Sequence, residues 1–268
     1  YRNSSGYVLS GPEYLTVFNG ETGAAMKTVN YLPARGTVSS WGDNYGNRVD
    51  RFNACTAYLD GVHPSVVMCR GYYTRTTLAA YDFKNKKLVQ RWYHNSDKKG
   101  QGAYGDGNHN VSVADVDGDG KDEIILGSAI IDDDGKTYSR TGFGHGDAMH
   151  VSDMDPDRPG LEGWFVHEDK GSAYGYEMRD LKSNKVIHGK KTGTDNGRGM
   201  AADIDAKHKG FEMWSSAPGV FDCKGKQISS TKPSVNFRIY WDGDLQDELL
   251  DGTKCDKWNG NGVNRLIT

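Results

Sequence analysis

The chain has 268 residues, the length of one large β domain or two ordinary domains. Its 33 Lys and Arg residues nearly balance 36 Asp and Glu residues, and the net charge of −3 argues against a nucleic-acid-binding surface. No apolar run reaches membrane-spanning length and no signal-peptide pattern opens the chain, so we expect no membrane partner and a chain that begins partway through a longer protein.

The composition indicates an all-β protein. The 35 Gly residues and many Asp residues supply tight turns, whereas 15 Tyr and 6 Trp residues favour strands, and long helical periodicity is missing. Residues 14–18 and 24–26 predict a hairpin around a turn at 19–23. The alternating segments 77–83 and 88–92 predict a second hairpin.

An acidic motif recurs along the chain and precedes an apolar run each time. The full copies begin at Asp115, Asp153, Asp203 and Asp242, so they are spaced 38, 50 and 39 residues apart, and a worn copy lies at 57–61. A four-stranded β-propeller blade usually has ~40–50 residues. We therefore predict a propeller whose acidic loops join the first and second strands of each blade.

The repeat predicts about five to six blades, with the chain beginning and ending within a blade. A propeller must close its ring to cover the edges of its strands. We therefore interpret residues 1–268 as part of a single propeller domain, an incomplete ring from which N-terminal and C-terminal blades are missing.

The first full acidic motif has the pattern of a calcium loop. Its carboxylates stand at alternate positions, Gly120 allows the sharp turn, and Asp122 and Glu123 follow and could complete the shell. The predicted ligands are Asp115, Asp117, Asp119 and Asp122. The second motif predicts another calcium ion bound by Asp153, Asp155 and Asp157. In the third motif Lys207 takes the place of the third carboxylate, so a plain turn is the better interpretation.

The four cysteines are Cys55, Cys69, Cys223 and Cys255, an even number. Cys55 and Cys69 flank a hairpin-like segment, and we expect a local disulfide there, as in a secreted or periplasmic protein. Four buried thiols are the alternative, because spacing alone does not establish pairing.

Polar residues precede each acidic motif at matching positions. In a propeller the loop into the innermost strand faces the central channel, so these side chains are expected to meet at one mouth. Taken singly, each of these residues would be interpreted as a solvated histidine or as an arginine in an ion pair. A functional role is favoured because polar residues recur at this position in four copies of the motif, with a different residue type each time. The segments are 108–110, 145–147, 196–198 and 236–238, and Glu168 follows a predicted second strand.

The segments 107–110, 115–123, 142–153 and 195–200 resemble rhamnogalacturonan lyases of polysaccharide lyase family 11. The resemblance implies an eight-bladed calcium-binding propeller, present here in its middle blades, with an active cleft over the central channel. It further implies a rhamnogalacturonan I substrate from pectin. We expect a secreted or periplasmic monomer.

The resemblance also implies roles for individual residues. His109, His145 and Glu168 match positions around an active-site metal, Asp147 matches a neighbouring acidic position, and Arg198 matches a basic cleft position. The catalytic candidates are therefore His109, His145, Asp147 and Arg198. The family's cleft lysine and tyrosine would lie beyond Thr268, so the general base and acid are left unassigned.

These residues suit β-elimination, which removes the proton at C5 of galacturonate and expels the sugar linked at O4. Calcium and Arg198 would offset the charge of the uronate carboxylate. A histidine base is the less favoured option, because a metal-bound nitrogen cannot also accept a proton. Two other functions stay open. One is a non-catalytic adhesion or carbohydrate-binding propeller, and the other is a hydrolase with Asp147 and Glu168 as its paired carboxylates.

Overall fold

The computed structural model describes all 268 residues, which form strands, loops and two short 3-10 helices, η1 (Val38–Trp41) and η2 (Gly46–Arg48). No helix is both long and apolar enough to span a membrane. The chain forms two compact units, Tyr1–Gly142 and Phe143–Thr268. The all-β prediction is confirmed.

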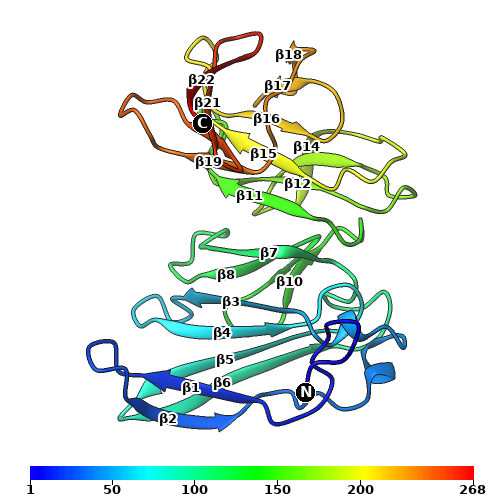
Figure 1. Cartoon of the computed structure of the whole chain (residues 1–268), viewed down its shortest axis with the longest axis vertical. Coiled ribbons are helices and arrows are strands. Elements are labelled where there is room, and N and C mark those ends of the chain that lie inside the picture. Colours follow the sequence, from blue (N-terminus) through cyan, green and yellow to red (C-terminus); the bar gives the residue numbers. More distant parts are fainter. The chain divides into compact units, whose positions relative to one another are not determined.

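The first unit contains a hairpin and two four-stranded antiparallel sheets, each with its strands in chain order (Figure 1). The hairpin is β1 (Tyr14–Phe18) and β2 (Ala25–Asn30). The first sheet contains β3 (Phe52–Ala57), β4 (Ser65–Arg70), β5 (Thr76–Lys84) and β6 (Lys87–Ser96). The second contains β7 (Gly107–Ala114), β8 (Glu123–Gly127), β9 (Ala129–Ile131) and β10 (Thr137–Arg140).

The second unit contains three more antiparallel sheets of four strands, again in chain order. One contains β11 (Ala148–Ser152), β12 (Glu162–Val166), β13 (Tyr176–Asp180) and β14 (Lys185–Lys190). The next contains β15 (Gly199–Ala202), β16 (Glu212–Ser215), β17 (Val220–Asp222) and β18 (Gln227–Ser229). The last contains β19 (Phe237–Ile239), β20 (Glu248–Asp251), β21 (Lys254–Trp258) and β22 (Val263–Ile267).

Both predicted hairpins are confirmed, and every acidic motif joins the first and second strands of its sheet. The turn between β5 and β6 has Asn85 and Lys86 at φ of 51° and 60°, the left-handed pair that suits the twist of a two-residue hairpin. The last sheet has four strands, and the division of the chain into propeller blades stays a prediction.

Apolar side chains fill the space between neighbouring sheets of a unit. In the first unit a buried cluster combines Val67 and Leu78 of one sheet with Ile124 and Ile131 of the next. In the second unit Trp164 and Met213 belong to one such cluster, and a further cluster joins the last two sheets. The second strands are apolar on both sides because both of their faces are covered.

The acidic loops also link neighbouring sheets. Tyr58 N donates to Asp122 Oδ2 at 2.6 Å, and Phe211 N donates to the carbonyl oxygen of Met154 at 2.9 Å. Asp203 N donates to Asp247 Oδ2 at 3.0 Å. The acidic motif therefore connects adjacent sheets as well as turning the chain.

The four cysteines are free thiols, so the predicted disulfide between Cys55 and Cys69 is wrong. The register places Cys55 opposite Val67 and Cys69 opposite Asn53, so the two thiols are not directly paired across the strands. Both pack in the apolar cluster of the first unit. Burial raises the pKa of the Cys55 thiol to about 12, which keeps it protonated.

Candidate active site and acidic loops

Three predicted site residues converge in the second unit. His145 and Asp147 lie just before β11, and Glu168 lies just after β12. These strands are paired with Ala148 opposite Val166, so the two loops leave the same edge of the sheet. His145 Nε2 lies 3.6 Å from Glu168 Oε1 and 4.0 Å from Asp147 Oδ1.

The chemistry of this set fits a divalent cation. Two carboxylates and one imidazole place their ligand atoms within 4.8 Å of one another. Carboxylate oxygens suit calcium, magnesium and manganese, and the imidazole widens the choice to transition metals. His145 is only 9% exposed, whereas Asp147 and Glu168 are half-buried, so the set is open on its carboxylate side.

A buried polar network supports the segment that carries Glu168. His167 Nε2 lies 3.3 Å from Glu177 Oε1, and Arg179 Nη1 lies 3.0 Å from the same oxygen. All three side chains are fully buried. The network fixes the end of β12 and thereby orients the segment that carries Glu168. These residues were not predicted from the sequence, although an alternation of charged residues in an otherwise apolar strand is a signal for them.

Arg198 lies beside the same set. An ideal Cβ on Gly197 would lie 3.5 Å from Asp147 Oδ2, so the segment that carries Arg198 passes next to that carboxylate. Asn196 N donates to the carbonyl oxygen of His167 at 3.2 Å, which fixes this segment to the Glu168 loop. The Arg198 side chain is exposed. The structure therefore brings His145, Asp147, Glu168 and the Arg198 segment together.

His109 lies on β7 in the first unit, between two tyrosine hydroxyls. Tyr72 Oη is 3.2 Å from Nδ1 and Tyr73 Oη is 3.1 Å from Nε2. A neutral imidazole has one donor and one acceptor nitrogen, so the two hydroxyls fix the orientation of the ring. The two tyrosines come from the loop after β4 and were not predicted from the sequence.

The first acidic loop contains a buried carboxylate oxygen with no hydrogen-bond partner. Glu123 is fully buried; its Oε2 accepts the N–H of Val116 at 2.8 Å, and its Oε1 has no partner. Burial raises the pKa of Glu123 to about 7, and Asp117 and Asp132 add to the effect. The Glu123 carboxylate lies within 4.8 Å of Asp115 and Asp117. A calcium ion fits this donor set.

The other two predicted ligands of this loop, Asp119 and Asp122, lie outside this cluster. Asp119 pairs with Lys121 Nζ at 3.2 Å, and Asp122 accepts the N–H of Tyr58. Asp132 and Asp133, which follow β9, approach Glu123 instead. The sequence signal for Glu123 is a glutamate that opens the second strand of four sheets, at Glu123, Glu162, Glu212 and Glu248.

Lysine side chains contact the second acidic loop. Lys224 Nζ lies 2.5 Å from Asp155 Oδ1 and 3.3 Å from Asp157 Oδ2, and Lys209 also pairs with Asp157. Ammonium groups therefore supply positive charge here. The calcium ion bound by Asp153, Asp155 and Asp157 stays a prediction.

Comparisons with known proteins place this geometry in a family. All residues, 1–268, match the sequence model described as "Rhamnogalacturonan lyase family 11, C-terminal domain". The chain is 56% identical to the rhamnogalacturonan endolyase YesW of Bacillus subtilis over 268 residues, covering 99% of this chain and 43% of that protein. It is 54% identical to the exolyase YesX of the same organism over 286 residues, covering 100% of this chain and 47% of that protein.

The solved structure of the Bacillus licheniformis rhamnogalacturonan lyase PL11 is also similar, with a TM-score of 0.95 and 57% identity over 100% of this chain and 46% of that one. The chain thus spans about half the length of the relatives it matches. The matched model is that of a C-terminal domain, whereas the resemblance placed the chain among the middle blades. The chain belongs to rhamnogalacturonan lyase family 11.

Proposed function

We propose that this chain forms part of a rhamnogalacturonan lyase that cleaves the rhamnose–galacturonate backbone of pectin by β-elimination. The convergence of His145, Asp147 and Glu168 beside the Arg198 segment carries the proposal. Relatives at 54% and 56% identity are named exolyase and endolyase, which favours the lyase over an adhesion protein or a hydrolase.

We further propose that the sheets are blades of a β-propeller. Five sheets have four antiparallel strands in chain order, and a two-stranded hairpin precedes them. This up-and-down order, with an apolar cluster between neighbouring sheets, is typical of propeller blades. Secretion, a monomeric state and an eight-bladed ring stay predictions.

In the proposed reaction a general base takes the C5 proton of galacturonate, and the electrons of that C–H bond form the C4–C5 double bond. The C4–O4 bond breaks with its electron pair on O4, which an acid or water protonates. Arg198 would bind the uronate carboxylate and offset its charge, which makes the C5 proton more acidic. His145, Asp147 and Glu168 would hold a divalent cation, which supplies further positive charge when bound. A role for His109 at this metal stays a prediction from the family resemblance.

We also propose a structural calcium ion in the first acidic loop, held by Asp115, Asp117 and Glu123. The ion would neutralise the buried Glu123 carboxylate and fix the loop that contacts Tyr58 of the neighbouring sheet. Asp119 and Asp122 remain in the loop with the contacts described above.

The test is incubation with rhamnogalacturonan, with and without a chelator, following the ultraviolet absorbance of unsaturated uronate. Homogalacturonan is the control substrate. Because the chain spans about half of its relatives, the assay uses a chimera in which residues 1–268 replace the matching part of the B. licheniformis protein. A chelator-sensitive rise on rhamnogalacturonan alone supports the proposal. An active parent protein and a folded but inactive chimera would contradict it.

A further inference from the structure

A cavity of about 500 Å³ lies in the second unit between two neighbouring sheets. Its walls come from the end of β14, the loop that follows it, the loop after β16, and β18. This volume lies within the range of protein sites for small molecules, about 300–1,000 Å³. None of the residues predicted from the sequence lines it.

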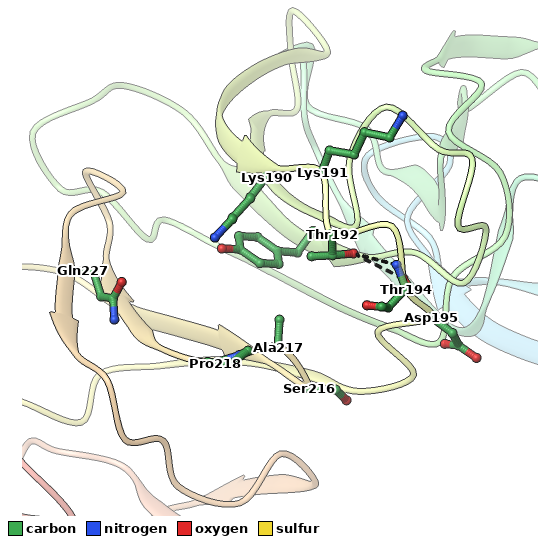
Figure 2. A pocket seen from close by; sticks show the side chains of 10 residues that line it. Lys190, Lys191, Thr192, Thr194, Asp195, Ser216, Ala217, Pro218 and Gln227 are labelled. Carbon is green, nitrogen blue, oxygen red and sulfur yellow. Dashed lines mark hydrogen bonds between the residues drawn. The ribbon is translucent and has the colours of Figure 1, made fainter.

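The lining residues offer positive charge and neutral hydrogen-bonding groups. Lys190 and Lys191 are exposed lysines that take part in no ion pair, and the acid among the lining residues is Asp195. In Figure 2 the Lys190 side chain extends into the space facing Gln227, while Lys191 points away from it. The Thr192 hydroxyl on the wall donates to the carbonyl oxygen of Thr194 at 3.2 Å and accepts from Asn196 Nδ2 at 2.9 Å, so it orders the loop. The cavity therefore suits a ligand with one carboxylate and several hydroxyls.

The cavity adjoins the candidate active site. Ser216, on its wall, donates its N–H to the carbonyl oxygen of Arg198 at 3.0 Å. An ideal Cβ on Gly197 would lie 3.6 Å from Asp195 Oδ1 and 3.5 Å from Asp147 Oδ2. The segment 195–198 thus separates the cavity from the His145 set, with one carboxylate on each side. A polymer that crosses the Arg198 segment would meet both.

We propose that this cavity is a subsite for a second uronate of the polysaccharide, with Lys190 as the partner of its carboxylate. The inference rests on the proposed function and extends it. In a backbone that alternates rhamnose and galacturonate, every bound segment longer than a disaccharide carries another carboxylate near the one at the cleaved bond. Lys190 selects for that acid, while Gln227 offers a contact to a sugar hydroxyl.

The test is titration calorimetry of the chimera in chelator, with a tetrasaccharide of alternating rhamnose and galacturonate and with the same tetrasaccharide after its carboxyls are reduced to alcohols. The variant is Lys190→Met, which keeps the aliphatic stem and removes the charge. The matched control is Lys185→Met, an exposed lysine at the other end of β14. Thermal melts establish that both variants are folded like the wild type.

Lys190→Met should bind the acidic tetrasaccharide about fivefold more weakly, the size expected for one partly exposed charge pair. Its affinity for the reduced tetrasaccharide should stay the same, and Lys185→Met should match the wild type with both. Equal affinity of Lys190→Met and the wild type for the acid would overturn the proposal. So would an equal loss with both ligands, or no binding by the wild type.

The elimination assay separates this inference from the proposed function. If Lys190→Met selectively loses affinity for the acidic tetrasaccharide but the chimera forms no unsaturated product, the subsite is supported and the lyase proposal is contradicted. If the chimera forms unsaturated product but Lys190→Met binds the tetrasaccharide as well as the wild type, the lyase is supported and the subsite is contradicted.

Discussion

The ammonium group of Lys257 lies 2.9 Å from Oε1 of the buried Glu248. It also lies 2.5 Å from Asp242 Oδ2 and contacts Asp244. Burial lowers the pKa of Lys257, but the bonds to these three carboxylates outweigh it and raise the pKa above its usual value. In the first acidic loop the equivalent oxygen of Glu123 has no such partner. Each of the two loops has a buried glutamate, but only Glu248 has a lysine ammonium group beside it.

Replacement of this lysine should make the last acidic loop depend on calcium. In Lys257→Met the Glu248 carboxylate loses its cation, and we expect the unfolding temperature to fall by roughly 5 °C. Added calcium should recover most of the loss, because Asp242, Asp244 and Glu248 lie close enough to bind an ion. Differential scanning calorimetry with and without calcium measures both effects.

The control is Lys254→Met, which removes an exposed lysine from the same strand and should leave the unfolding temperature unchanged. A Lys257→Met protein as stable as the wild type in chelator would show that the lysine does not neutralise the loop.

The buried Glu212 carboxyl should make the protein less stable as pH rises. Burial raises its pKa from 4.5 to about 8, against the hydrogen bonds from Ile204 N and Asp205 N. The folded state therefore binds more protons than the unfolded state between pH 4.5 and 8, so the stabilisation present below pH 4.5 is lost as pH rises to 8. In the presence of a chelator, we expect the unfolding temperature to fall by roughly a few degrees between pH 5 and pH 8. Glu212→Gln should flatten this dependence, and an unchanged slope would refute the assignment.

The backbone at Gly210 should accept no residue other than glycine. Its φ is +88°, and a Cβ would lie 2.4 Å from the carbonyl oxygen of Met154 in the neighbouring sheet. Gly160 has a φ of +100° with nothing within 4 Å, so it isolates the cost of the backbone conformation. We expect urea unfolding to give a loss of about 1 kcal/mol for Gly160→Ala and about 3 kcal/mol for Gly210→Ala. Equal losses would mean that the close approach is unimportant.

His145→Ala should remove the imidazole from the candidate metal set. In the chimera we expect the rate of unsaturated-uronate formation to fall by about 100-fold or more, because the two carboxylates are left without a nitrogen ligand. His208→Ala, in the loop between β15 and β16, is the control and should retain the rate. A His145→Ala chimera with more than about a tenth of the parent rate would contradict a role at the reaction centre.

The strand pattern, the hairpins and the positions of the acidic loops can be predicted from the residues alone. These features follow from local spacing: alternation sets the faces of a strand, and closely spaced glycines and aspartates set the turns. The convergence of His145 with Glu168 could also be predicted, because each lies at the end of a strand in one antiparallel pair.

The contacts of each acidic loop depend on how the strands and sheets pack together. Lys224 reaches Asp155 from a position 69 residues away, and Lys257 reaches Glu248 from the next strand. Cys55 and Cys69 stay unpaired because the register sets each opposite another residue. Charge neutralisation and cross-strand pairing depend on distances between side chains that are far apart in the chain. Packing between strands and sheets sets those distances, whereas local sequence spacing does not.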